Sequence, residues 1–333
     1  MTLPEGLAGR RTLTVLMPVF NDWESAALLT RDLAAAFAGS GLALDLVMVD
    51  DCSIDAVPTA LPADPSIRRI DCLKLATNVG HQRAIATGLM ALCDRADLDM
   101  VAVMDSDGED RPAELRALVE KASADPGAAY VAQRSKRSEG WLFRAFYWLY
   151  VRIFRLLTGH GINFGNFSVL QAAQVRRVAN SAHVWNNFPA AVIQARIPVR
   201  YVPTVRGTRY AGQSRMNFVS LVAHGLGAIS VFSEAVFIRI LVASALLLLL
   251  SLSLAGLSLF MKLVIQVAFP NWATTVLGFA LVISVQALMM PILMAFLLLN
   301  NRSLVQPLPR KIVLDLIDER RTLWCAPDCS HKA

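Results

Sequence analysis

Short apolar runs alternate with helical patterns over the first 110 residues of the chain. We predict strands at residues 13–17, 44–49, 70–75 and 100–104. Leucines at helical spacing follow the first run, and a second helical pattern begins near Gly80 and ends near Cys93. Runs that are apolar throughout are typical of a mostly parallel sheet with helices on both faces. The pattern therefore predicts an α/β fold.

Two much longer apolar runs lie near the C-terminal end. Residues 240–261 and residues 263–301 carry no charge, so each run is long enough for a helix across a hydrocarbon core of roughly 30 Å. We predict two transmembrane helices, near residues 238–261 and 273–299, because uncharged stretches of this length are uncommon in soluble cores. A pair of buried core helices is the alternative.

The charges around these runs predict an orientation. Lys262 is the only charge between the two predicted spans. The charges that follow the second span include Arg302, Arg310, Lys311, Arg320 and Arg321. This bias keeps both termini and the active site cytoplasmic. The first eleven residues lack the apolar stretch of a secretory signal. We therefore expect a multi-pass protein of a bacterial inner (cytoplasmic) membrane, with its net charge of +6 facing anionic lipids.

Composition narrows the class of protein. The chain is 55% hydrophobic and 17% charged, which is too apolar for an ordinary soluble protein. Its five scattered cysteines are typical of a reducing compartment. Cys325, Cys329 and His331 lack the fourth ligand that a zinc site needs. A nucleic-acid partner is not expected despite the pI of 9.3, because no recognised binding motif accompanies the basic residues.

Polar side chains gather where the predicted strands end. They are Asn21, Asp22, Asp50, Asp51, Asn78, Asp105 and Asp107. Ligands of open α/β sheets bind beyond the carboxyl ends of the strands, so these side chains mark a binding site. Asp105 and Asp107 can place carboxylate oxygens on one hard cation that bridges the phosphates of a nucleotide. The alternative is that such Asp residues cap the helices that follow.

The middle of the chain is rich in arginine and free of acids. Between Glu139 and Glu234 there are ten Arg and no Lys, Asp or Glu. Arginine guanidinium groups with no acid nearby in sequence are typical of a phosphate-binding site. The predicted acceptor phosphate site comprises Arg134, Arg206, Arg209, Ser214 and Arg215. Solvated surface arginines are the alternative, but no acid lies nearby in sequence to pair with them.

Two segments of the same region have helical patterns with an apolar face. Residues 141–157 place Arg144, Trp148, Arg152 and Arg155 on one face, and residues 218–232 form a less charged pattern. Helices of this kind lie in the membrane interface. Core helices with solvated arginines are the alternative. We therefore divide the chain into a nucleotide-binding half (1–140), a phosphate-binding half with the two amphipathic helices (141–235), two spans (236–301) and a cytoplasmic tail (302–333).

Four motifs in a fixed order carry a family resemblance. They are PVFND at residues 18–22, DDCSID at 50–55, NVGH at 78–81 and DSDGEDRPAE at 105–114. They resemble the successive motifs of the inverting family 2 glycosyltransferases. With RYAGQSR at residues 209–215 and two C-terminal spans, the chain is most similar to the polyprenyl-phosphate glycosyltransferases, the branch that includes dolichol-phosphate mannose synthase. The resemblance covers roughly residues 12–300, and the tail beyond it is uninformative.

The resemblance implies a GT-A fold, a nucleotide-sugar donor linked to UDP or GDP, and Mg²⁺ or Mn²⁺. The nucleotide would be bound by Pro18, Asn21, Asp22, Asp50, Asp51, Asn78, Gly80 and Ser106. The metal ligands would be Asp105, Asp107 and Glu109. The acceptor would be a polyprenyl phosphate, with undecaprenyl phosphate the usual bacterial carrier. Some relatives assemble as oligomers, so a homo-oligomer is possible.

One departure from the family pattern bears on the acceptor. Relatives often carry an Asp in the segment corresponding to residues 164–168, where this chain has Asn166. A sugar or lipid hydroxyl generally needs a base, whereas a phosphate monoester has a second pKa near 6 and arrives mostly deprotonated. We predict a phosphate acceptor, with Asp105, Asp107 and Asn166 as the catalytic residues. The alternatives are transfer to a lipid hydroxyl of diacylglycerol or ceramide, with Asp110 or Glu114 as base, and a non-enzymatic membrane scaffold.

Overall fold

The computed structural model describes residues 10–59, 61, 64–134, 141–212, 218–266, 271–302 and 310–326. Their contacts divide the chain into two compact units. The sheet unit comprises residues 1–143, 162–231 and 307–333, and the hairpin unit comprises residues 144–161 and 232–306. This division differs from the four parts drawn from the sequence, because the C-terminal segment belongs to the sheet unit.

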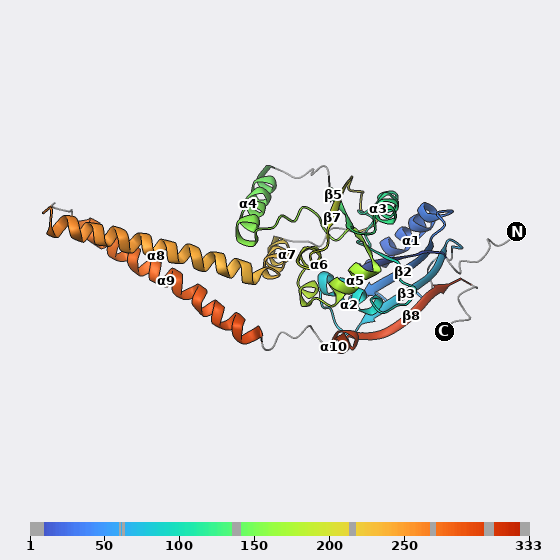
Figure 1. The fold of residues 1–333 in the computed structure, drawn as a ribbon. Helices are drawn as coiled ribbons and strands as arrows, with labels where there is room; N and C mark the ends of the chain where they lie inside the picture. Colours follow the sequence, from blue (N-terminus) through green and yellow to red (C-terminus); the bar gives the residue numbers. More distant parts are fainter. Residues whose placement is uncertain are drawn as a thin grey trace. The chain divides into compact units, whose positions relative to one another are not determined.

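Among the described residues, eight strands form one sheet in the order β7-β5-β6-β4-β1-β2-β3-β8 (Figure 1). The strands are β1 Thr12–Val19, β2 Ala43–Asp50, β3 Ile67–Leu75, β4 Met100–Val103, β5 Ala129–Arg134, β6 Ser168–Gln171, β7 Val199–Thr204 and β8 Ile317–Cys325. Only β6 and β8 pair antiparallel to their neighbours, so the predicted mostly parallel sheet is confirmed. Within it, Val15 of β1 lies between Leu46 of β2 and Ala102 of β4.

Helices cover both faces of the sheet, as expected for the GT-A fold class. Helices α1 (Trp23–Phe37) and α3 (Pro112–Ala124) pack on one face with a core that includes Leu29 and Leu118. The other face is covered by α2 (His81–Leu92), α5 (Ala172–Ala179), η1 (Ala182–Trp185), α6 (Phe188–Gln194) and α10 (Arg310–Leu314). All eight residues of β1 and of β2 are buried, which explains why these strands were recognisable as continuous apolar runs.

The segment that the sequence left uninformative forms the edge strand β8. It pairs antiparallel with β3, and Trp324 Nε1 donates to the carbonyl of Ile67 over 3.2 Å. Of its nine residues only Leu323 is buried, because an edge strand with one solvated face needs few apolar positions. The strand was missed in the sequence because four of its residues are charged: Asp318, Glu319, Arg320 and Arg321.

Helix α7 (Phe218–Ser230) also belongs to the sheet unit. It packs closely on the turn before α6, because a Cβ on Gly227 would meet the carbonyl oxygen of Asn186 at 3.1 Å. Val222 and Leu226 are exposed on its outer side. The predicted helix is present, while its location at a membrane interface stays a prediction.

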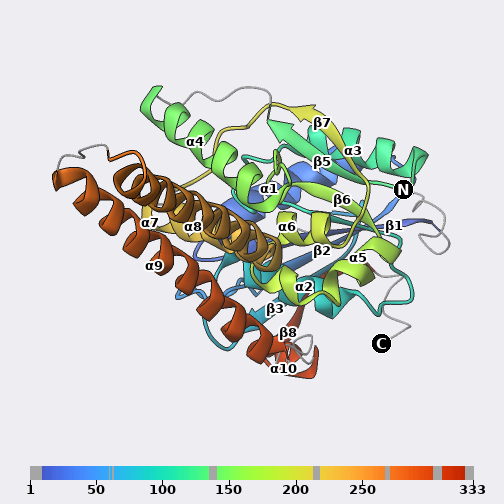
Figure 2. The same ribbon diagram turned by 60° about the vertical axis from the view of Figure 1, so that its left-hand side comes forward.

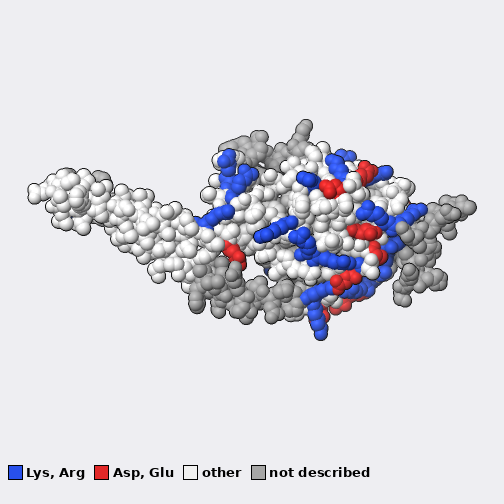
Figure 3. Space-filling view, in the orientation of Figure 1, with Lys and Arg blue, Asp and Glu red and all other residues white. Residues whose placement is uncertain are grey.

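The hairpin unit contains the two long apolar helices, α8 (Ser233–Leu263) and α9 (Asn271–Arg302). They lie side by side (Figures 1 and 2) and are joined by a 2.8 Å hydrogen bond between Ser251 and Ser284. Both are long and apolar enough to cross a membrane. In the most apolar stretch of each helix, only 11% of the residues are buried. They carry no charged side chain over most of the face seen in Figure 3. They indicate a membrane protein rather than a pair of core helices.

Helix α4 (Trp141–Thr158) confirms the helix predicted over residues 141–157. Arg152 lies over the ring of Trp148, 5.2 Å from its centroid, so these two predicted neighbours do share a face. Trp148 and Leu156 are exposed, at 59% and 75%. Arg239 of α8 donates to the carbonyl of Leu157 over 2.7 Å and satisfies one of the free carbonyls at the end of α4.

Candidate active site

Asn21 fastens the loop after β1 to the loop after β2. Its backbone N–H donates to Ser53 Oγ over 2.8 Å, and its Oδ1 accepts from the N–H of Ile54 over 2.7 Å. Its φ of +49° lies in the left-handed region, which Asn tolerates better than most residues. Asn21 therefore shapes the rim of the sheet edge where the predicted nucleotide residues lie.

The two carboxylates that end β2 have separate structural partners. Asp50 is fully buried, and its Oδ1 accepts from the N–H of Ser53 over 3.1 Å. Asp51 accepts from the N–H groups of Val79 and Gly80 over 2.7 and 2.9 Å. Burial raises the pKa of Asp51, and these two hydrogen bonds oppose that shift. Neither residue caps a following helix, so the capping alternative is wrong for this pair.

The remaining predicted nucleotide residues lie around the same edge. Asn78 donates from Nδ2 to the carbonyl of Asp51 over 3.0 Å. Gly80 precedes α2 with φ of +89°, a conformation that L side chains rarely adopt. Pro18 and Ser106 are buried in β1 and in the loop after β4. The structure thus brings the predicted nucleotide residues together, and their binding of a nucleotide stays a prediction.

The loop between β4 and α3 carries the predicted metal ligands. Asp105 Oδ1 lies 3.2 Å from His81 Nε2, and the Asp105 N–H donates to Asp110 Oδ2 over 3.1 Å. Asp107 Oδ1 accepts from the N–H of Glu109 over 3.0 Å. Burial raises the pKa of Asp107, and the nearby charges of Asp105 and Glu109 add to that shift. A cation beside Asp107 would offset the repulsion from these two neighbouring acids.

Two arginines supply positive charge to these carboxylates. Arg209 pairs with Asp22 and, over 3.0 Å, with Asp107. Arg206 Nε donates to Glu109 over 2.7 Å. The expectation that no acid pairs with these arginines is therefore wrong. That expectation considered only acids close in sequence. In the fold, the loop after β7 lies against the β4–α3 loop, which brings Arg206 to Glu109, 97 positions away, and Arg209 to Asp107, 102 positions away.

Asn166 lies at the end of a chain of hydrogen bonds that the sequence did not predict. The backbone N–H of Phe188 donates to Gln82 Oε1 over 2.7 Å, and Gln82 Nε2 donates to Asn166 Oδ1 over 2.9 Å. Because a backbone N–H can only donate, this order fixes both amides. Asn166 then directs its Nδ2 toward His81 Nε2, 2.9 Å away. His81 ends the NVGH motif, and the only sequence signal for Gln82 was its place directly after that motif.

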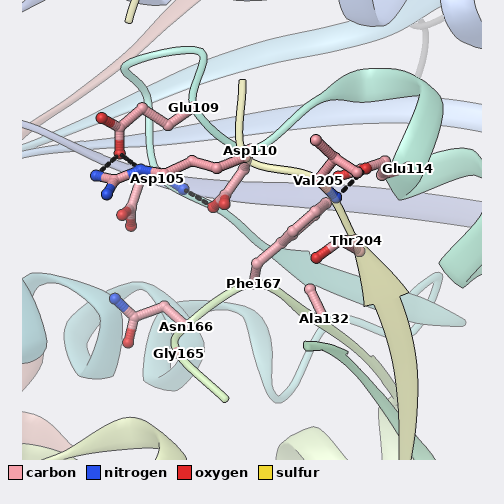
Figure 4. A pocket seen from close by; sticks show the side chains of 11 residues that line it. Asp105, Glu109, Asp110, Glu114, Ala132, Gly165, Asn166, Phe167, Thr204 and Val205 are labelled. Carbon is pink, nitrogen blue, oxygen red and sulfur yellow. Dashed lines mark hydrogen bonds and ion pairs between the residues drawn. The ribbon is translucent and has the colours of Figure 1, made fainter. Parts of the chain in front are cut away.

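A pocket in the sheet unit joins these parts (Figure 4). Its lining includes Asp105, Glu109, Asp110, Glu114, Gly165, Asn166, Phe167, Thr204, Val205 and Arg206. Asn166 lies across the pocket from Glu109 (Figure 4). The predicted catalytic Asp105 and Asn166 therefore face one space. Of the other predicted acceptor residues, Ser214 and Arg215 lie outside the described residues, and Arg134 ends β5 with its side chain outside them.

The carboxylate oxygens of this loop are ligands that Mg²⁺ and Mn²⁺ accept. Asp105, Asp107 and Glu109 would hold the ion, because Asp105 and Glu109 each lie close enough to Asp107 to act on its charge. Within the described ranges, no three His, Cys, Asp or Glu side chains already converge on one point. Arg206 and Arg209 engage two of the three carboxylates, so the donor set fits a metal once these arginines move.

Comparison with known proteins identifies relatives of the chain. A profile of the family described as "Glycosyl transferase family 2" matches residues 14–180. The chain is 25% identical over 270 residues to the undecaprenyl-phosphate 4-deoxy-4-formamido-L-arabinose transferase of Enterobacter sp. (strain 638), covering 78% of this chain and 79% of that protein. It is 36% identical over 102 residues to the succinoglycan biosynthesis protein ExoO of Rhizobium meliloti (strain 1021), which covers 31% of this chain and only 28% of that protein.

Among solved structures, the glucosyl-3-phosphoglycerate synthase of Mycobacterium tuberculosis was crystallised with Mn²⁺, UDP-glucose and phosphoglyceric acid. It is 15% identical to this chain, with a TM-score of 0.48 and coverage of 69% of this chain and 80% of that one.

Proposed function

The chain belongs to glycosyl transferase family 2, and on that premise we propose that it moves a sugar from a UDP- or GDP-sugar to undecaprenyl phosphate or a similar polyprenyl phosphate. The products are a polyprenyl-phosphate sugar and a nucleoside diphosphate. The 25% identity to an undecaprenyl-phosphate sugar transferase over most of both chains supports this acceptor class. The two apolar helices of the hairpin unit support a membrane-bound enzyme.

The observation that carries the proposal is that two acids of the pocket, Asp110 and Glu114, each accept a hydrogen bond from a backbone N–H. Asp110 is buried and accepts from the N–H of Asp105, and Glu114 accepts from the N–H of Val205 over 2.5 Å. These are the two residues on which transfer to a lipid hydroxyl would depend. Across the pocket stands the neutral amide of Asn166. Such a site suits an acceptor that arrives already deprotonated, as a phosphate monoester does.

The reaction then follows from the chemistry of the acceptor. An oxygen of the lipid phosphate attacks the anomeric carbon while the bond from that carbon to the nucleotide diphosphate breaks, with inversion. The Asn166 amide, held by Gln82, orients the acceptor or a sugar hydroxyl. Arg206, which lines the pocket, and Arg209 supply the charge that attracts the phosphate. A divalent ion on Asp105, Asp107 and Glu109 would neutralise the departing diphosphate.

The membrane setting agrees with such an acceptor. Helices α8 and α9 would anchor the enzyme with both termini and the active site on the cytoplasmic side, as the basic residues after the second span predict. The exposed Trp148 and Leu156 of α4, with Arg152 beside them, would lie in the interface.

An acceptor panel tests the proposal. Full-length protein in detergent is incubated with Mn²⁺ or Mg²⁺, a set of UDP- and GDP-sugars, and undecaprenyl phosphate, undecaprenol or diacylglycerol. We expect glycolipid and nucleoside diphosphate only with the phosphate. Equal transfer to undecaprenol or diacylglycerol would favour the lipid-hydroxyl alternative, and no transfer or release from any donor would favour the scaffold.

A further inference from the structure

Arg206 and Arg209 contact the same carboxylates that the metal and the nucleotide need. We propose that residues 205–211, here called the arginine latch, compete with the metal–nucleotide for this site, and that donor binding releases both arginines to the acceptor phosphate. The inference rests on the proposed function for its last step only. Each arginine then has two partners in succession, first the carboxylates and then the acceptor phosphate.

Arg209 sits where two predicted ligands meet. Its guanidinium spans the carboxylates of Asp22, predicted to bind the nucleotide, and Asp107, predicted to bind the metal. Its Nε also donates to the carbonyl of Ala211 over 2.8 Å, which holds the fork in place. The side chains of Asp22 and Asp107 are each only 14% exposed. The guanidinium therefore neutralises a largely enclosed pair of acids.

The latch is also fastened through its backbone. The N–H of Gly207 donates to the carbonyl of Glu109 over 2.8 Å, and the N–H of Tyr210 donates to the carbonyl of Asp107 over 3.0 Å. The Tyr210 ring covers Gly108, where a Cβ would meet it at 2.3 Å, so only glycine permits this contact. The Tyr210 hydroxyl donates to Asp32 of α1. The contacts seal the latch onto the loop that carries all three predicted metal ligands.

Binding of a divalent ion to these carboxylates while the latch contacts them is unfavourable. One oxygen of Asp107 accepts from the N–H of Glu109 and the other from Arg209. Arg206 places two nitrogens on a single oxygen of Glu109. An incoming Mn²⁺ would add two positive charges beside both guanidiniums, and like charges at this distance repel strongly in a partly buried site. Metal binding and latch closure therefore oppose each other.

Release of the latch would complete the acceptor site. Arg206 already lines the pocket between Asp105 and Asn166, so a small movement turns its fork from Glu109 toward that space. A phosphate is a bidentate partner for arginine much as a carboxylate is. The acceptor phosphate site is then formed only after the metal and nucleotide are in place. This order keeps the lipid phosphate from occupying the pocket without a donor.

Binding of Mn²⁺ to the full chain in detergent tests the inference without any lipid acceptor. Free Mn²⁺ is followed by electron paramagnetic resonance, alone and with UDP or GDP. Arg209→Gln removes the competing charge, and Tyr210→Phe loosens the latch while keeping both arginines. We expect Arg209→Gln to bind Mn²⁺ with nucleotide about tenfold more tightly than the unaltered protein, within the range typical of coupled sites, and Tyr210→Phe to shift the same way by less.

The control is Arg116→Gln, which removes one positive charge from α3, where Arg116 pairs with Glu120 away from the pocket. It should leave Mn²⁺ affinity unchanged. Hydrogen exchange gives a second readout: adding Mn²⁺ and nucleotide should speed exchange at the N–H groups of Gly207 and Tyr210. Unchanged or weaker Mn²⁺ binding in Arg209→Gln, or slower exchange in the latch, would overturn the inference. A failure of the polyprenyl-phosphate assay would leave these results standing.

Discussion

Gln82 Nε2 lies 2.9 Å from Asn166 Oδ1 and donates to it, so a residue of α2 sets the amide that faces the pocket. The backbone N–H of Phe188 holds Gln82 in turn. Asn166 therefore presents its Nδ2 in one direction only, toward His81 Nε2. The predicted catalytic position Asn166 is therefore occupied by an oriented neutral amide.

This arrangement makes Gln82 a positioning residue. We expect Asn166→Ala to lower kcat about tenfold, because one oriented hydrogen bond is lost in the transition state. Gln82→Leu should lower kcat by a similar factor with little change in the KM for the donor. The double variant should be no slower than Asn166→Ala, since both changes remove one function. Steady-state rates of the four proteins check this, and additive losses would show that Gln82 acts independently of Asn166.

Asp105 is expected to be indispensable. Its carboxylate faces the pocket and is a predicted ligand of the ion that neutralises the departing diphosphate. Asp105→Ala should reduce glycolipid formation below detection. The matched control Asp315→Ala removes an exposed acid from the turn after α10 and should leave the rate unchanged. Retention of more than a tenth of the activity by Asp105→Ala would remove this residue from the reaction.

Acid should weaken the sheet unit in part through Asp97. Hydrogen bonds and charge from Arg95, followed by Arg68, lower the pKa of Asp97 to about 2 from an ordinary value of 3.8. Between these values the unfolded chain binds more protons, so stability rises with pH. The contribution of Asp97 is complete above about pH 4 and is lost as the pH falls toward 2.

The loss will be modest, because the Asp97 side chain is 48% exposed and surface ion pairs are screened. Thermal unfolding in detergent between pH 2 and pH 5 measures it. Asp97→Asn should unfold at a lower temperature than the unaltered protein at pH 5, and the difference should narrow toward pH 2. A difference that stays constant over this range would mean that the ionisation of Asp97 contributes nothing.

The hydrogen bond between Ser251 and Ser284 should stabilise the pair of long helices. Both side chains are buried between helices whose other surfaces are apolar and exposed. Hydrogen bonds of this kind within membranes contribute about 0.6 kcal/mol on average. In a double-mutant cycle with Ser251→Ala and Ser284→Ala, the free energy of unfolding is measured by titration with a denaturing detergent. The coupling energy should be of about that size. A coupling near zero would indicate that the two hydroxyls do not depend on each other.

The sequence was sufficient for the parts of the fold with continuous apolar character. Strands β1, β2 and β4 and helices α8 and α9 were predicted because burial on all sides, or exposure to lipid, demands uncharged runs. Strand β8 was missed because it is an edge strand whose residues are mostly solvated. Its pairing with β3 joins positions about 250 apart, and no local pattern encodes such a contact.

The same limit applies to the candidate site. The motif residues at the strand ends were found because each follows an apolar run. The pairing of Arg209 with Asp22 was not predicted. These residues are 187 positions apart, and only the folded loop after β7 brings them together. Gln82 was missed for a different reason, since its role depends on a backbone N–H at Phe188 that no side-chain motif reveals.

The identity of the attacking atom is the measurement to make first, with undecaprenyl phosphate carrying ¹⁸O in its phosphate oxygens. Mass spectrometry of both products follows the label. We expect all of the ¹⁸O to remain in an undecaprenyl-phosphate sugar, with an unlabelled nucleoside diphosphate released. A nucleoside monophosphate product, or glycolipid formed equally from unphosphorylated undecaprenol, would contradict direct attack by the lipid phosphate.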